Sequence, residues 1–353
     1  MRGSVDTDER PFVLIWEVTQ ACDLACEHCR ANAQPGRHPD ELTTEEGKSV
    51  LDAAARFDEN QLVVLSGGDP CKRPDLTELV AYGDDLGLRM SLTPSGTSSL
   101  TGDAIEELSE AGLRRMALSI DGGDPEHHDA FRGEDGSFAE TMRAAENARD
   151  ANVPLQVNTT VCAETVGELP AIREVVSEIG AVLWSVFFLV PVGRGQLLDP
   201  ISPERADRVM AWLAETADEE PFGVKTTEAP QYRRVKLQER DAGPEAGLKR
   251  RSGIVAGDGF AFVSHTGDIF PSGFLPKAAG NVRKDDLVDV YQNSDLFEGL
   301  RDRDTLSGKC GACEFRHVCG GSRSRAFAHT GDPLASDPLC PYEPEGYQGV
   351  SGD

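Results

Sequence analysis

Three cysteines close together near the start of the chain are the residues best suited to chemistry. Cys22, Cys26 and Cys29 follow an apolar run from Phe12 to Val18, in a Cys-x3-Cys-x2-Cys pattern. Three thiolates on one short loop can bind three irons of a [4Fe–4S] cube, because cysteine thiolates are the usual protein ligands of such clusters. The fourth iron would stay open to another ligand. A zinc site, or chance spacing, is the alternative interpretation.

A second cysteine group lies near the other end of the chain. Its members are Cys310, Cys313, Cys319 and Cys340, and four thiolates suffice to bind one further cluster. Zinc in a four-cysteine site is the alternative, since a Cys-x2-Cys pair followed by two later cysteines is also a zinc pattern. The chain has nine cysteines and no apolar secretory segment at its start, which favours metal ligands over a disulfide framework.

The motif Ser66-Gly67-Gly68-Asp69-Pro70 follows the next apolar run, 61–65. Combined with the cysteine loop upstream, it resembles the radical S-adenosylmethionine (SAM) superfamily. In that family the open iron binds the amino and carboxylate groups of SAM, and a similar Gly-Gly-Glu-Pro motif presents backbone carbonyls to the SAM ammonium. The resemblance implies that Gly67, Gly68, Asp69 and Pro70 bind SAM, and that the first cluster cleaves it reductively to a 5′-deoxyadenosyl radical. Glycines suit this role because no Cβ keeps the ligand away.

The same resemblance gives roles to polar residues at later strand ends. Ser95, in Thr-Pro-Ser-Gly, is expected near the SAM ribose or adenine. Ser119 and Arg132 belong to a Ser-x-Asp-Gly … His-Asp-x-x-Arg pattern and are expected to hold the SAM carboxylate, which the planar guanidinium fork matches. Asn158 is a further candidate at the barrel mouth. A helix cap or a surface pair is the alternative for each. His28 replaces the aromatic residue that often precedes the third cysteine.

Alternating β-rich and helical patterns between residues 12 and 218 must position these side chains. The candidate strands are 12–18, 61–65, 88–92, 114–119, 154–160 and 182–189, and the candidate helices are 43–57, 75–85, 101–111, 137–150, 166–179 and 202–217. Six βα units in series predict an α/β fold with a parallel sheet and functional residues at the C-terminal strand ends. The family implies a partial (β/α)6 TIM-like barrel, although an open doubly wound sheet fits the same pattern.

The expected domains are an N-terminal tail (1–11), the barrel (12–220), a linker or bridging region (221–252), a small C-terminal domain (253–346) and a disordered tail (347–353). A β-hairpin is expected near 260–270 and a helix near 286–301. The late cysteines, with Gly-Gly after Cys319, resemble the SPASM/twitch domain of radical SAM enzymes. Full SPASM domains carry seven cysteines and two clusters. Because serines stand at Ser272 and Ser322 here, the resemblance implies one auxiliary [4Fe–4S] cluster.

The segment from Cys319 to Asp332, followed by Asp337-Pro-Leu-Cys340, resembles the radical SAM enzymes that modify tetrapyrrole side chains in heme d1 and alternative heme biosynthesis. The resemblance implies an iron porphyrin substrate whose carboxylate side chains undergo oxidative decarboxylation or deacetylation. It also implies a low-potential electron donor such as ferredoxin or flavodoxin.

A polyanionic substrate needs local cations, and four arginines are candidates for its carboxylates: Arg73, Arg194, Arg323 and Arg325. His265 and His329 could approach the porphyrin iron axially. The alternative is an ordinary surface role for each arginine and a solvated or capping role for each histidine.

Two other functions compete with this interpretation. A peptide- or protein-modifying radical SAM maturase of the SPASM type often has an N-terminal peptide-binding domain, for which residues 1–11 leave no room. A non-catalytic iron–sulfur electron carrier would not need a three-cysteine site paired with Gly-Gly-Asp-Pro.

Composition excludes several classes of partner. The net charge is −26, from 61 acidic and 35 basic residues, so a nucleic-acid partner and an anionic membrane surface are disfavoured. No run of 18 apolar residues predicts a membrane span, and a cytoplasmic location is expected. Only eight lysines accompany 27 arginines. Excess carboxylate with few lysines favours a halophilic protein over an ordinary acidic one.

Overall fold

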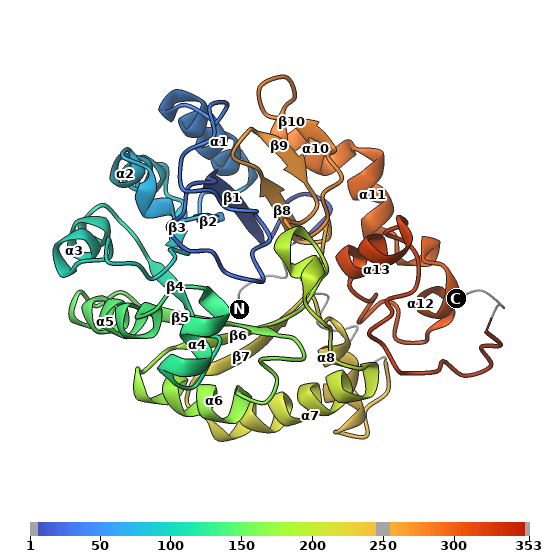
Figure 1. Ribbon diagram of the computed structural model, residues 1–353. Coiled ribbons are helices and arrows are strands. Elements are labelled where there is room, and N and C mark those ends of the chain that lie inside the picture. Colours follow the sequence, from blue (N-terminus) through green and yellow to red (C-terminus); the bar gives the residue numbers. More distant parts are fainter. Residues whose placement is uncertain (1–5, 245–254, 350–353) are drawn as a thin grey trace.

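The computed structural model describes residues 6–244 and 255–349 of the chain. A curved sheet forms the centre, and helices cover its outer face (Figure 1). The elements of the barrel are β1 (Val13–Thr19), α1 (Thr44–Phe57), β2 (Leu62–Gly67), η1 (Pro70–Lys72), α2 (Leu76–Asp85), β3 (Arg89–Leu92), α3 (Gly102–Glu110), β4 (Arg115–Ser119), α4 (Pro125–Arg132), α5 (Ser137–Asp150), β5 (Leu155–Val161), α6 (Leu169–Glu178), β6 (Leu183–Phe188), η2 (Gly193–Leu197), α7 (Pro203–Glu219), β7 (Gly223–Thr227) and α8 (Gln231–Gln238).

The C-terminal elements continue the same sheet before turning helical. They are β8 (Phe260–Val263), β9 (Asp268–Phe270), β10 (Gly280–Asn281), α10 (Leu287–Asn293), α11 (Asp295–Arg301), η3 (Arg303–Thr305), α12 (Gly308–Ala312) and α13 (Arg323–Thr330). The strand order is β10-β9-β8-β1-β2-β3-β4-β5-β6-β7. Pairing is parallel from β8 through to β7, and antiparallel in β8–β9 and β9–β10.

Alternation along the strands separates a dry outer face from a polar inner face. Trp16 on β1 and Trp184 on β6 are fully buried on the outer face, where Trp184 packs edge-on against Trp212 of α7. Register then places a row of polar residues on the inner face. Ser119 pairs with Asn158, Asn158 with Ser185, and Ser185 with Lys225 on β7. The concave side of the sheet therefore carries the groups that can meet a ligand.

The six predicted strands and six predicted helices are all present, with ends within three residues of the expected ones. The expected hairpin is present as β8–β9, and the helical stretch expected near 286–301 consists of two helices, α10 and α11. Thr43 and Glu46 form a capping box on α1, Ser202 caps α7, and Gly136 is the N-cap residue of α5. The expected linker 221–252 contains β7 and α8, and its residues 245–252 lie outside the described ranges.

Two further features bear on the expected domains. The C-terminal region is joined to the barrel through β8, which lies directly beside β1. The expected tails lie partly outside the described residues, at 1–5 and 350–353. Within the described ranges, no helix combines the length and the apolar character needed to cross a bilayer.

Candidate active site

The cysteine loop leaves the C-terminal end of β1 and folds back on itself. Cys22 N–H donates to the Gln34 carbonyl (2.7 Å). The Cys22 sulfur accepts from Leu24 N–H and the Cys29 sulfur from Ala33 N–H, each at 3.4 Å. All nine cysteines of the chain are free thiols. Backbone N–H groups directed at sulfur are what an iron–sulfur cluster ligand needs to carry thiolate charge.

Burial raises the pKa of both Cys22 and Cys26 above the ordinary thiol value. Arg132, Ser95 and backbone donors lower it only in part. Without a metal these thiols are therefore protonated, and a bound metal must displace their protons. The loop fits a cationic cluster better than it fits free thiolates.

The two glycines after β2 bring that strand end against the cysteine loop. A Cβ on Gly67 would lie 2.2 Å from the Thr19 carbonyl oxygen, and one on Gly68 would lie 2.3 Å from the Ala21 carbonyl oxygen. Gly67 also has φ of 137°, which other residues rarely adopt. Gly68 N–H donates to the Thr19 carbonyl and Asp69 N–H to the Ala21 carbonyl. Only glycine allows this close approach.

Asp69 is buried, and its carboxylate is hydrogen-bonded to other residues of the chain. Its carboxylate accepts from Cys71 N–H at the start of η1, where Pro70 is the first residue, and from the Thr97 hydroxyl (2.9 Å). Ser95 is closer to the cluster ligands. Its hydroxyl donates to the Gly68 carbonyl (2.7 Å) and lies 3.3 Å from the Cys22 sulfur. The loops after β2 and β3 are thus joined at the cysteine loop.

Arg132, at the end of α4, brings a positive charge among the cysteines. Its Nη2 donates to the Ser95 carbonyl (3.2 Å) and its Nη1 contacts Asp121 (3.5 Å). Burial opposes its charge, but Cys26, Asp121 and Cys22 together raise the pKa of Arg132. The buried Nε atom has no hydrogen-bond partner among the described residues.

Two more buried nitrogens beside the cysteines lack partners within the described ranges: His28 Nδ1 and Arg194 Nη2. His28 stacks flat on Phe131, with ring centroids 4.7 Å apart, and burial lowers its pKa to about 4. Unsatisfied buried donors are rare in native proteins. Together with Arg132 Nε they indicate that a polar group missing from the bare chain belongs here, so the residues fit a cluster and SAM.

Ser119 and Asn158 are neighbours on the inner face, at the edge that carries the cysteine loop. Gln156 donates to the Asn158 side-chain oxygen (2.7 Å) and so fixes its orientation. Asp121 is the acidic residue of the Ser-x-Asp-Gly pattern, and from the sequence it could be a turn residue or a functional one. In the structure it is buried, accepts from Thr160 N–H (2.7 Å) and faces Arg132, so it orients the guanidinium.

The four C-terminal cysteines line one small cavity, together with Gly320, Gly321 and Arg234. Cys310 sulfur accepts from Asp337 N–H (3.4 Å), and Cys319 sulfur from Gly321 N–H (3.4 Å). Both glycines are left-handed, with φ of 72° and 65°, and a Cβ on Gly321 would lie 3.0 Å from the Cys310 sulfur. Burial raises the pKa of Cys340 to about 11, so this thiol is protonated without a metal. The arrangement can hold one four-thiolate cluster.

The serines at two positions of further cluster ligands are used elsewhere. Ser272, Ser322 and Ser324 all donate their hydroxyls to the carboxylate of Glu228, which follows β7. A half-buried carboxylate with three hydroxyl donors is a satisfied polar network. It occupies the hydrogen-bonding capacity of Ser272 and Ser322.

The four arginines expected at the substrate do not have free guanidinium groups. Arg73 is buried and donates to Asp75 and to the Val18 carbonyl. Arg194 donates to the Cys26 carbonyl (2.8 Å) and to the Ala33 carbonyl. Arg323 donates to three carbonyls and contacts Cys310, and Arg325 donates to Asp337 and to three carbonyls. These bonds use the donors of Arg73, Arg323 and Arg325, whereas Arg194 keeps Nη2 unpartnered within the described ranges. A substrate role for the four arginines stays a prediction.

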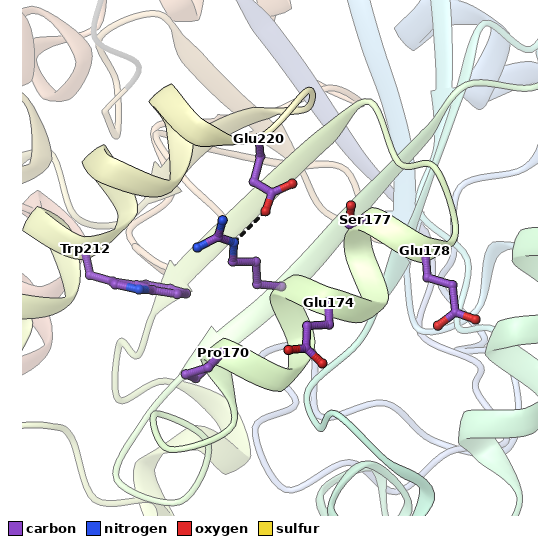
Figure 2. Close-up of a pocket in the computed structure, with 7 residues that line it drawn as sticks. Pro170, Glu174, Ser177, Glu178, Trp212 and Glu220 are labelled. Carbon is purple, nitrogen blue, oxygen red and sulfur yellow. Dashed lines mark hydrogen bonds and ion pairs between the residues drawn. The ribbon is translucent and has the colours of Figure 1, made fainter.

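One groove lies on the outer helices, away from both cysteine groups in the sequence and in the fold. It has a volume of about 540 Å3 and is lined by residues of α6, α7 and the turn after α7, including Arg173, Trp212 and Glu220 (Figure 2). Arg173 pairs with Glu220 at 2.6 Å. None of the residues expected to do chemistry lines this groove, so it is not the site.

Comparison with known proteins agrees with this geometry. Residues 16–175 match the family described as the radical SAM superfamily. An AdoMet-dependent heme synthase of Methanosarcina barkeri is 41% identical, with 95% of this chain and 97% of the relative covered. This chain belongs to the radical SAM superfamily. A second AdoMet-dependent heme synthase, from Nitratidesulfovibrio vulgaris, is 38% identical over 94% of this chain and 92% of that relative.

Solved structures show the same fold for this radical SAM enzyme. SuiB of Streptococcus suis bound to S-adenosylmethionine aligns with a TM-score of 0.73 at 17% identity, covering 95% of this chain and 78% of SuiB. The structure titled anSMEcpe with bound AdoMet gives a TM-score of 0.70 at 16% identity and 93% coverage of both chains. The expected partial barrel with a SPASM-type C-terminal region is confirmed.

Proposed function

We propose that this enzyme is an AdoMet-dependent heme synthase, which removes CO2 and two hydrogens from each of two propionate side chains of an iron porphyrin. The observation that carries the proposal is the near full-length identity, 38–41%, to two proteins of that name. A [4Fe–4S] cluster bound by Cys22, Cys26 and Cys29 would supply the electron that cleaves SAM, and the radical chemistry belongs to that cofactor.

The chain's own residues position SAM. Arg132 is a planar cation beside the cysteines with an unused Nε donor, so it suits the SAM carboxylate. Ser95, Ser119 and Asn158 offer further polar contacts at the same strand ends. Gly67 and Gly68 leave the approach to the cysteine loop free of side chains, and Asp69 holds that turn in place.

We propose one auxiliary [4Fe–4S] cluster, bound by Cys310, Cys313, Cys319 and Cys340. Four thiols around one cavity, with N–H donors to two of the sulfurs, support it. The Glu228–serine network argues against a second auxiliary cluster. With four thiolate ligands this cluster would carry electrons or stabilise the fold. A low-potential donor such as ferredoxin or flavodoxin, and a cytoplasmic location, remain predictions.

Two other cations can replace the four arginines as partners for the substrate carboxylates. Arg115 of β4 and Lys225 of β7 both lie on the inner face of the sheet by register. Neither has an acidic partner within the described ranges, in a chain of net charge −26. Lys225 is in contact with water. Its surroundings in the concave sheet, followed by the charge of Arg115, lower its pKa to about 8. A substrate carboxylate would relieve this repulsion.

The proposal is tested by anaerobic reconstitution with iron, sulfide, SAM and reductant. Supplied with an iron porphyrin tetracarboxylate, the protein should form 5′-deoxyadenosine together with a product that has lost CO2 and two hydrogens per modified side chain. Conversion of a peptide and not of the porphyrin would favour the maturase alternative. Absence of 5′-deoxyadenosine with both clusters intact would leave only the electron carrier.

Lys225→Met should raise the KM for the porphyrin about tenfold with kcat changed less, since a hydrogen bond to a charged group contributes roughly 1.5–3 kcal/mol. Lys48→Met is the matched control, because Lys48 pairs with Glu45 and Glu78 on the outer surface. Equal KM values for the two variants would remove Lys225 from the substrate site.

A further inference from the structure

A buried carboxylate on β1 is paired with His265, one of the two histidines that the sequence offers as an axial ligand. Glu17 lies on the inner face of the sheet, and its side chain is 5% exposed. One oxygen accepts from Arg30 Nη2 (2.6 Å) and the other contacts Nδ1 of His265 (2.6 Å). The ion pair with Arg30 leaves the second oxygen of Glu17 as an acceptor for the His265 ring.

The hydrogen bond to Glu17 decides which histidine nitrogen is available. Because Nδ1 donates to the carboxylate, the neutral ring keeps its lone pair on Nε2. Nε2 has no hydrogen-bond partner within the described ranges, and the His265 side chain is 14% exposed. The nearest ring is that of His38, edge-on at 5.2 Å. A carboxylate behind one imidazole nitrogen is the arrangement that orients metal-binding histidines in proteins and makes them more basic.

The position of His265 suits a ligand that reaches the first cluster. It follows β8, the strand beside β1, so it lies at the edge of the sheet from which the cysteine loop departs. Arg30, which shares Glu17, directly follows Cys29 in the sequence. The Arg30 guanidinium also lies 4.7 Å over the Phe262 ring on the inner face. Flat aromatic and guanidinium surfaces are suitable walls for a planar macrocycle.

We propose that His265 binds the iron of the porphyrin substrate through Nε2, with Glu17 and Arg30 as the residues that position it. The inference rests on the proposed function, since an iron-bearing ring must be the substrate. Histidine is the common axial ligand of haem iron. A fixed axial bond would set the height and tilt of the ring and so present the same side-chain edge to SAM at each turnover.

The test compares binding of an iron porphyrin tetracarboxylate and of its metal-free form to the reconstituted protein, by absorption and electron paramagnetic resonance. His265→Asn keeps an N–H donor for Glu17 but removes the imidazole. It should weaken iron porphyrin binding at least tenfold and change the spin-state signals, while binding of the metal-free ring stays the same. Imidazole added to His265→Ala should restore the wild-type spectrum.

His329→Asn is the matched control, because His329 is exposed on α13, and it should behave as wild type. An unchanged spectrum and affinity in His265→Asn would overturn the inference and leave the proposed function standing. Equal losses for the iron and metal-free rings would assign His265 to the fold alone. Failure of the wild-type protein to bind either ring would overturn the proposed function, and the inference with it.

Discussion

At the scale of single residues, ligand binding depends on which hydrogen-bond donors have no partner within the described part of the chain. Arg132 and Arg194 both lie at the cysteine loop. Arg194 uses its Nε and Nη1 on loop carbonyls and keeps Nη2 unpartnered, while Arg132 keeps Nε unpartnered. The sequence identifies such arginines equally well. It cannot say which are already bonded, because that depends on backbone carbonyls brought together by folding. The cysteine groups can therefore be identified from their spacing, whereas the choice of substrate cations stays a prediction.

The two cysteine groups can be separated by mutation. Cys26→Ala should lower the iron content from about eight to about four per chain and abolish SAM cleavage, since three thiolates hold the first cube. Cys310→Ala should lose a similar amount of iron but keep SAM cleavage. Iron analysis with a 5′-deoxyadenosine assay checks both. Cys162→Ala is the control, as Cys162 is buried beside Thr165, and loss of iron in that variant would contradict the ligand sets.

Buried His128 should make stability depend on pH. Its Nδ1 accepts from Asp121 N–H (3.3 Å), and burial, followed by Arg132, lowers its pKa to about 4. Below pH 6.5 His128 binds a proton in the unfolded chain but not in the folded chain, so the free energy of unfolding falls as pH drops. From pH 6.5 to 5 the loss is about 2 kcal/mol.

Denaturant unfolding at several pH values should show this slope in the wild-type protein and a shallower one in His128→Gln. The exposed His329→Gln variant should keep the wild-type slope. Parallel curves for wild type and His128→Gln would contradict the assignment.

At the scale of elements, the sequence predicted the barrel strands well because their apolar runs are strong. It missed β7, which is half-exposed and polar, and α4, which is short and charged. Both owe their form to neighbours, since β7 pairs along β6 and α4 packs on α5. These two elements carry Lys225 and Arg132. Elements specified mainly by tertiary contact therefore carry the two side chains proposed to bind substrate and SAM.

The contact between the β2 turn and the cysteine loop has a direct test. In Gly68→Ala the new Cβ would meet the Ala21 carbonyl at 2.3 Å, so backbone must shift. We expect a loss of roughly 1–3 kcal/mol in the free energy of unfolding, with weaker cluster retention. Gly36→Ala, in the cysteine loop, is the control, because no atom lies within 4 Å of a Cβ at that position. Equal cluster retention in the two variants would argue against the close approach.

At the scale of the whole molecule, Arg325 ties the C-terminal region to the barrel. It pairs with fully buried Asp337 and donates to carbonyls at the end of β6 and after β7. Arg325→Met leaves Asp337 without its cation, which costs about 3–5 kcal/mol. Thermal unfolding should show it. Arg114→Met, which breaks an exposed pair with Asp84, should cost less than about 1 kcal/mol. Similar losses for the two would contradict the role of Arg325.

The halophilic character suggested by 61 acidic residues stays a prediction, since charge informs solubility and not fold. The parallel α/β sheet, in contrast, was predicted from six βα units, and the partial barrel from the family resemblance. The sequence did not predict that β1, near the N-terminus, pairs with β8 of the C-terminal region. The expected separate C-terminal domain begins with a strand that belongs to the barrel sheet, and strand pairing so distant in sequence leaves no local signal.

The pairing of β1 with β8 also has a consequence for the order of events during synthesis. Residues 13–16 emerge from the ribosome first, but their partners, 260–263, are made roughly 250 residues later. Until then one edge of β1 stays open, next to the cysteine loop, and open apolar edges invite association with other chains. That edge of β1 therefore stays exposed until most of the chain has been translated. Loading of the first cluster would best follow that late closure.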